Sequence, residues 1–192
     1  MGNYWTYVRI ESTSPDFFCC LCLCFCVLGF HLWCTSLCVH KMANMNNIRG
    51  YDGCPTKFMS WNVKSLNHPV KFKKIFSRLK QLGVDIAFLQ ETHIRSCDSS
   101  RLVRGWAGQV YQSNFCSKAR GVAIMIGRGV QFTASHVQAD SAGRYVIVVG
   151  KLYSLPVILA CIYAPNWDDP TFFTKFFLSF TRYVFTSSYT WW

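Results

Sequence analysis

Two polar residues with the chemistry to hold a metal ion stand out in this sequence of 192 residues. Asn62 and Glu91 each follow a run of apolar residues, and about 30 residues separate them, the length of a strand–helix–strand unit. Both strands of such a unit point the same way, so their carboxyl ends lie side by side where open α/β sheets form their sites. An amide oxygen and a carboxylate brought together there suit Mg²⁺, which binds through carboxylates, water and substrate phosphate.

The elements that must position this pair follow from hydropathy and from turn residues. We expect a strand, a helix with basic residues outside its apolar stripe, a buried strand, five further strands and a Phe-rich helix. The last two strands fit a hairpin, which places Tyr163 at a strand end and Asn166 in its exit loop. The predicted ranges are 56–62, 69–82, 85–90, 110–113, 121–126, 130–137, 145–152 and 157–163, with the last helix starting near 170.

Four motifs in this order resemble those of the endonuclease/exonuclease/phosphatase superfamily, which has the DNase I-like fold. They are SWNVKSLN, FLQETH, GVAIMIG and IYAPN, and the resemblance runs from about residue 57 to 178. It is closest to the endonuclease domain at the front of LINE-type retrotransposon polyproteins. The resemblance implies an α/β protein, half of a four-layer α/β/β/α sandwich, that hydrolyses DNA phosphodiesters with Mg²⁺.

The resemblance also implies roles for individual residues. Glu91 would be the metal-binding carboxylate, and Asn62 would help to position the metal and the phosphate. Tyr163 would contact the scissile phosphate. The substrate-binding candidates are Asn166, which would line the site, and His93.

The sequence departs from the family after Tyr163. There the family carries an Asp-x-Asn strand end, a further Asp and a closing Asp–His pair. Here the acidic residues after Tyr163 are Asp168 and Asp169, and no histidine follows His136. We therefore expect the N-terminal half of a nuclease domain, inactive alone, with the inner face of one sheet uncovered.

Charge and composition restrict the partners. Lys and Arg number 20 against 9 Asp and Glu, a net charge of +11, which favours a polyanion such as nucleic acid or an anionic membrane surface. A solvated basic surface also fits. No small-molecule cofactor is expected. Seven of the 11 cysteines lie between Cys19 and Cys38, at spacings that match no paired zinc-binding pattern.

The N-terminal residues 1–41 form an apolar, Cys-rich segment. Its stretch 17–39 lacks Lys, Arg, Asp and Glu and is long enough to span a bilayer as a helix, with the C-terminal part in the cytosol. The alternative is an extension that is not native to the domain, because Met42 and Met45 offer later starts; the location would then be nuclear or cytoplasmic. Residues 42–55 resemble a linker.

The partial nuclease domain is expected over 56–180, followed by an unrelated tail at 181–192. Residues from Arg182 onward show no helix or strand pattern. The codons of Trp191 and Trp192 read Gly-Gly one base later, which is the pair expected before the missing family Asp. A shift of reading frame near Thr181 is therefore our hypothesis, and the genomic DNA tests it.

Three further functions stay open beside a degenerate nuclease fragment. One is a membrane-tethered basic protein, anchored through 17–39. Another is a nucleic-acid-binding module without catalysis, supported by the net charge. The third is a divergent phosphatase or exonuclease of the same superfamily, although the IYAPN motif favours the DNA-acting branch.

Overall fold

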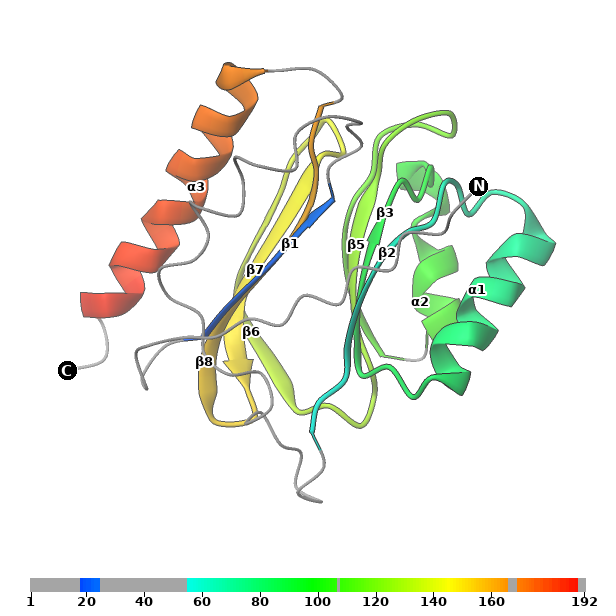
Figure 1. Ribbon diagram of the computed structural model, residues 1–192, viewed down its shortest axis with the longest axis horizontal. Coiled ribbons are helices and arrows are strands. Elements are labelled where there is room, and N and C mark those ends of the chain that lie inside the picture. Colours follow the sequence, from blue (N-terminus) through cyan, green and yellow to red (C-terminus); the bar gives the residue numbers. More distant parts are fainter. Residues whose placement is uncertain (1–17, 25–54, 107, 166–168, 190–192) are drawn as a thin grey trace.

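The computed structural model describes residues 18–24, 55–106, 108–165 and 169–189. Two four-stranded sheets face each other, with helices α1 and α2 on one side and α3 on the other (Figure 1). This confirms the predicted four-layer α/β/β/α fold class.

The elements are β1 (Phe18–Cys24), β2 (Phe58–Asn62), α1 (Pro69–Gln81), β3 (Ile86–Gln90), η2 (Ser96–Asp98), α2 (Ser100–Trp106), β4 (Gln109–Ser113), β5 (Val122–Ile126), β6 (Phe132–Ala139), β7 (Tyr145–Leu152), β8 (Leu155–Tyr163) and α3 (Pro170–Tyr189).

The strand–helix–strand unit that carries the candidate pair is confirmed. Strands β2 and β3 are parallel, with Asn62 opposite Gln90, and α1 connects them. Pro69 suits the first turn of α1 because its missing N–H would have no partner there. Ile75, Phe76 and Leu79 recur at helical spacing and are buried against the sheet.

Helix α2 and the short η2 turn were not predicted. Both are short and lie in a polar stretch that reads as a loop, so no apolar period reveals them. Gly105 of α2 allows close packing of the two helices, because a Cβ there would lie 2.9 Å from the rings of Phe72 and Phe76. Arg101 places its guanidinium 5.3 Å from the centre of the Phe72 ring and completes this contact.

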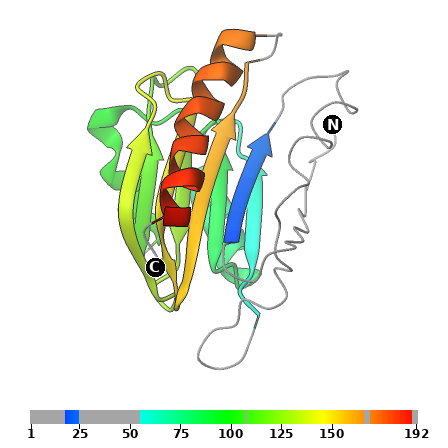
Figure 2. The same ribbon diagram turned by 90° about the vertical axis from the view of Figure 1, so that its left-hand side faces the viewer.

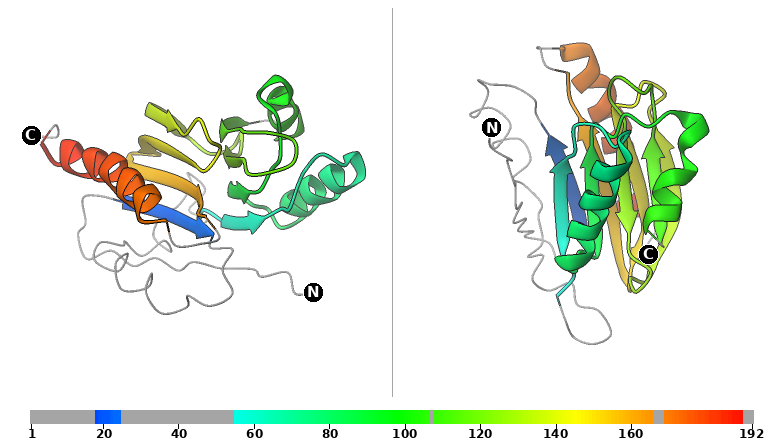
Figure 3. Two further views of the ribbon diagram at one scale, coloured as in Figure 1. Left: turned by 90° about the horizontal axis from the view of Figure 1, so that it is seen from above. Right: turned by 90° about the vertical axis from the view of Figure 1, so that its right-hand side faces the viewer.

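The main core lies between the two sheets. The sheet orders are β2-β3-β5-β4 and β1-β8-β7-β6, and seen from above the sheets stack between the helical layers (Figure 3). Phe88 and Ile124 face Val148 and Leu159 in this core. The expected bare inner face is therefore wrong, because the strands divide between two sheets that cover each other. The alternate residues of β3 and β5, such as Leu89, pack under α1 and α2.

The Phe-rich helix finds the partner surface that its sequence requires. Helix α3 lies against the outer face of the second sheet (Figure 2), with Phe176 only 1% exposed against Ile147, Ile158 and Ala160. The helix continues to Tyr189, so the expectation that residues from 182 onward lack helix is wrong over this range. Asp169 caps the start of α3 by accepting from Phe172 N over 3.0 Å, and Tyr183, beyond the predicted boundary, still packs against the core under the helix.

The apolar N-terminal segment was predicted as a helix over 17–39. Its described part, Phe18–Cys24, is instead strand β1, which pairs in parallel with Val157–Tyr163 of β8. A strand at this position satisfies backbone groups at the edge of β8. Residues 25–39 lie outside the described residues, and among the described helices none is long and apolar enough to cross a membrane.

Candidate functional site

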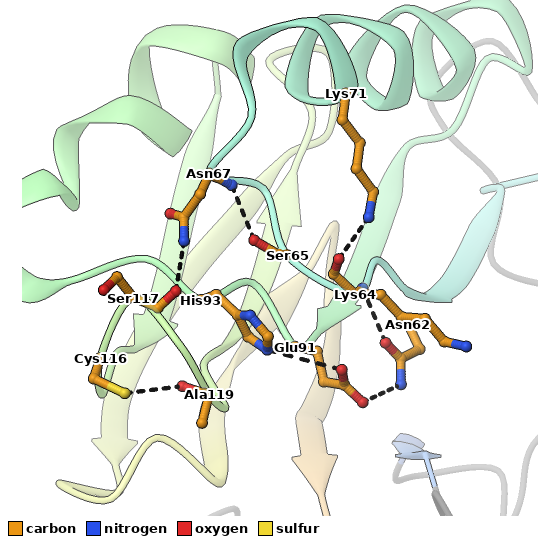
Figure 4. A network of polar contacts seen from close by, with 10 residues as sticks. All are labelled: Asn62, Lys64, Ser65, Asn67, Lys71, Glu91, His93, Cys116, Ser117 and Ala119. Carbon is orange, nitrogen blue, oxygen red and sulfur yellow. Dashed lines mark hydrogen bonds and ion pairs between the residues drawn. The ribbon is translucent and has the colours of Figure 1, made fainter.

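The structure brings Asn62 and Glu91 into direct contact at the carboxyl ends of β2 and β3 (Figure 4). The Asn62 side chain donates from Nδ2 to Glu91 Oε1 over 2.8 Å. The backbone N–H of Lys64 donates to Asn62 Oδ1 over 3.1 Å. A backbone N–H can only donate, so the amide orientation is determined by its partners. Asn62 therefore presents its NH₂ group to the carboxylate and holds it in one position.

Residues with strained backbone conformations are concentrated at this edge. Glu91 and His93 have φ values of 53° and 55°, in the left-handed region that L-residues rarely adopt. Three further residues at the same edge, Lys64, Ser65 and Arg120, also have positive φ. Backbone hydrogen bonds hold these loops, including Ser65 N to Glu91 O at 2.7 Å and His93 N to Arg120 O at 2.9 Å. Such strain gathers at functional sites when surrounding contacts enforce it.

Two glycines connect this edge to the second sheet. Gly121 has φ +91°, and a Cβ there would clash with Thr92 Oγ1. Its carbonyl accepts from Thr92 N, and its N–H donates to Gly143 O, both over 3.0 Å. Close approach of three backbone segments therefore requires glycine at this position.

Tyr163 lies at the same edge, at the end of β8. Its backbone N–H donates to Arg144 O over 2.7 Å, and Arg144 follows Gly143, which is bonded to Gly121. This chain of backbone hydrogen bonds runs from the Glu91 loop to Tyr163 across both sheets. The third predicted catalytic residue is therefore placed at the site end of the facing sheet, whereas Asn166 lies outside the described residues.

His93 lies beside the carboxylate, with Nε2 at 3.8 Å from Glu91 Oε2. Both side chains are mostly buried, at 17% and 16% exposure. Burial lowers the pKa of His93, Glu91 opposes this by attraction, and Lys71 adds to the lowering by repulsion. The imidazole is therefore mainly neutral at pH 7, and its role in substrate binding stays a prediction.

Two arginines at this edge were missed by the sequence reasoning. Arg120 donates to Ala142 O over 3.3 Å and stacks 4.6 Å above the Phe115 ring centre. The pKa of Arg144 is lowered, chiefly by burial and then by the nearby Arg120, against opposing attraction from acidic neighbours. Each arginine adjoins a glycine with positive φ. The sequence alone gives no signal that distinguishes them, because an Arg-Gly pair also occurs at 128–129.

Gln90 is a further residue that sequence reasoning missed. It is fully buried and points between the sheets, donating from Nε2 to Ser60 Oγ at 3.2 Å and to Cys161 Sγ at 3.5 Å. A polar residue at the end of an otherwise apolar strand, directly before Glu91, is the signal that could have revealed it.

Among the described residues, Asn62 donates to the carboxylate of Glu91. The described ranges contain no group of three His, Cys, Asp or Glu residues that could hold a metal ion. They also place no Asp–His pair at Glu91. His136 contacts the Tyr183 hydroxyl at 2.8 Å, on the α3 side of the second sheet.

The described residues thus form a four-layer α/β/β/α sandwich, with an amide–carboxylate pair at the ends of two parallel strands. No family model matches the sequence. Among solved structures, truncated Caenorhabditis elegans TDP2 is similar with a TM-score of 0.43 and 23% identity, over 57% of this chain and 46% of that one.

Two further TDP2 structures are similar to a comparable degree. Another C. elegans TDP2 gives a TM-score of 0.44 and 22% identity, over 58% of this chain and 36% of that one. A D. rerio TDP2 humanized by 14 mutations gives 0.42 and 18%, over 55% and 45%. This chain spans less than half the length of each of these structures.

Proposed function

We propose that this chain carries the metal- and phosphate-binding part of a Mg²⁺-dependent DNA endonuclease of retrotransposon type. The observation that carries the proposal is the 2.8 Å hydrogen bond between Asn62 and Glu91 at the ends of two parallel strands. A carboxylate fixed by an amide at this edge is a preformed position for a cation that also binds substrate phosphate.

The donor set fits a hard cation. Glu91 offers carboxylate oxygens, and Mg²⁺ accepts one or two carboxylates when water and phosphate complete its shell. Asn62 orients the carboxylate, because its Nδ2 donates to Glu91 Oε1. Its Oδ1 accepts the Lys64 N–H and keeps a second lone pair that could face the cation. When bound, the cation would neutralise charge that develops on the phosphate.

The protein groups around Glu91 suit an anionic substrate. The pKa of Arg144 is lowered first by burial and then by repulsion from Arg120, and a bound phosphate would offset that repulsion. Tyr163 ends the neighbouring strand, and its backbone is bonded to Arg144. These three residues are our candidates for contacts to the scissile phosphodiester.

Water activation is expected to need a histidine held by a carboxylate other than the metal ligand, and the described residues place no such pair at the site. In the described part of the chain, the imidazole nearest Glu91 is His93, and its acidic neighbour is Glu91 itself. We therefore propose that this chain alone binds a cation and DNA but hydrolyses DNA at a negligible rate. When catalytic groups act as a unit, the loss of one member lowers the rate by orders of magnitude.

The test combines metal binding and nicking. We expect wild-type protein to bind Mn²⁺, used as a paramagnetic substitute for Mg²⁺, and Glu91→Gln to lose this binding in titrations followed by electron paramagnetic resonance. We expect no nicking of supercoiled plasmid in Mg²⁺ above the level of Glu91→Gln. Equal Mn²⁺ affinity in both proteins would refute the metal site. Strong nicking that Glu91→Gln abolishes would refute the proposed inactivity.

A nucleic-acid-binding module without catalysis is the second candidate. The observation that favours it is the excess of basic residues, including five cations on α1 without an acidic residue. DNA affinity that persists unchanged in Glu91→Gln and without divalent cations would support this alternative over a metal-centred one.

A further inference from the structure

Helix α1 carries a concentration of positive charge that begins beside the candidate site. Its 13 residues include five cations and no acidic residue. The ion pairs within the described residues are His93–Glu91 and Arg95–Asp98, and neither involves α1. The five cations are Lys71, Lys73, Lys74, Arg78 and Lys80.

These cations form two rows on opposite flanks of the helix. Lys71, Lys74 and Arg78 stand at positions i, i+3 and i+7, so they share one flank. Lys73 and Lys80 stand at i and i+7 on the other flank, across the face buried by residues such as Leu79. The two rows therefore differ in direction while belonging to one helix.

The first row starts at the candidate site. Lys71 Nζ donates to Lys64 O over 2.5 Å, and Lys64 N donates to Asn62 Oδ1 (Figure 4). From Lys71 to Arg78 the helix rises by about 10 Å. That length corresponds to about three nucleotide steps at about 3.4 Å along one strand.

We propose that Lys71, Lys74 and Arg78 form a track for the phosphate backbone of DNA, leading away from the Asn62–Glu91 pair. The inference deepens the proposed function and rests on it for the direction of the track. The strand whose phosphodiester lies at Glu91 would continue along α1, and each cation of the row would contact one phosphate.

The chemistry of α1 favours nucleic acid over a lipid surface. A helix that lies on a membrane exposes large apolar residues beside its cations. Here Ile75, Phe76 and Leu79 are 5%, 4% and 0% exposed, because they pack in the protein core. Val70 is the large apolar residue of α1 that is exposed. The helix therefore offers charge without an apolar surface to insert.

Two matched double variants test the track. K74A/R78A removes two charges from the proposed row, and K73A/K80A removes two from the opposite flank of the same helix. All four side chains are exposed, and alanine has high helix propensity, so both variants are expected to fold. Far-ultraviolet circular dichroism and thermal melting verify this before binding is measured.

The readout is the salt dependence of affinity for a short DNA duplex, measured by fluorescence anisotropy in EDTA. For K74A/R78A we expect the slope of log affinity against log salt to fall in magnitude by about 1.8, since each phosphate contact contributes about 0.9. Between about 50 and 200 mM salt, the wild-type affinity then falls about 12-fold more than that of the variant. For K73A/K80A the slope is expected to stay close to that of wild type.

The same change in both variants would overturn the track, because the binding would then depend on net charge alone. No change in K74A/R78A would overturn it as well. So would binding of phosphatidylserine vesicles that K74A/R78A weakens while DNA binding stays intact. The assay contains no divalent cation, so a failure of the track is distinguished from a failure of the metal site, which is tested by Mn²⁺ without DNA.

Discussion

An Arg-Gly dipeptide lies directly before strand β5 and another lies one residue after it, and the two copies have different surroundings. Arg120 and Gly121 precede the strand at the site edge, where both have positive φ and three backbone segments meet. Arg128 and Gly129 follow it at the opposite edge, where a Cβ on Gly129 would meet nothing within 4 Å. The two copies show that an Arg-Gly pair can be a structural and electrostatic part of a site or an ordinary exposed turn.

The comparison extends to the whole edge. Of the non-glycine residues with positive φ in the described ranges, Tyr153 alone lies at the far edge. The others adjoin the Asn62–Glu91 pair: Lys64, Ser65, Glu91, His93 and Arg120. The site edge is thus where the fold accepts unfavourable backbone conformations, and tertiary hydrogen bonds offset their cost.

The largest difference between the edges should appear in stability. Gly121→Ala forces a side chain into the left-handed region and against Thr92, so we expect a loss of about 2–3 kcal/mol in the free energy of unfolding. Gly129→Ala should change it by less than about 0.5 kcal/mol. Urea unfolding of both variants measures this, and equal losses would contradict the difference between the edges.

The next effect concerns the metal. Asn62→Ala removes the hydrogen bond that orients Glu91, and we expect Mn²⁺ affinity to fall about 10- to 100-fold, as for other residues that orient metal ligands. Asn67→Ala is the matched control, since Asn67 bonds Ser117 O and not the carboxylate. Unchanged Mn²⁺ affinity in Asn62→Ala would show that Glu91 is held by other contacts.

A smaller effect, on the salt dependence of DNA binding, is expected to distinguish Arg120 at the site edge from Arg128 at the far edge. Arg120→Ala should reduce the salt slope for DNA binding by about 0.9, the contribution of one phosphate contact. Arg128→Ala removes the same charge at the far edge and should leave the slope as it is. The anisotropy titrations described for α1 measure both variants. A matching decrease in the two would remove the electrostatic distinction between the edges.

The smallest effect has the opposite sign. Lys64 has φ 44° and an exposed side chain, so Lys64→Gly relieves backbone strain of about 1–2 kcal/mol while raising the entropy of the unfolded chain. We expect a net gain of about 0.5 kcal/mol in unfolding free energy. Thermal melting checks the sign, and a clear loss would mean that the Lys64 side chain itself stabilises the loop.

Much of the fold could be predicted because its signals are local. The apolar period of Phe72, Ile75 and Leu79 indicates α1, and the apolar run before Glu91 indicates β3. The parallel arrangement then follows from the connection length. The division of the strands into two facing sheets did not follow, because strands buried on both faces, such as β3 and β5, read alike in either arrangement.

The candidate site was predictable only where a residue's type implies its role. Asn62 and Glu91 were found from their strand-end positions, and the structure joins them. Arg120, Arg144 and Gln90 were missed, since their significance comes from tertiary neighbours and not from spacing. Strand β1 was misread as a helix because an apolar run without alternation does not distinguish a helix from a strand.

The buried Gln90 has a mechanical consequence. It joins the two sheets through Ser60 and Cys161, and it directly precedes Glu91, while Cys161 comes two residues before Tyr163. If one sheet slid over the other, the hydrogen bond from Gln90 to Cys161 would break. Because Gln90 is fully buried in an apolar layer, no water would take the place of the lost partner. Gln90 therefore helps to keep Glu91 and Tyr163 in a fixed relative position, although they belong to different sheets.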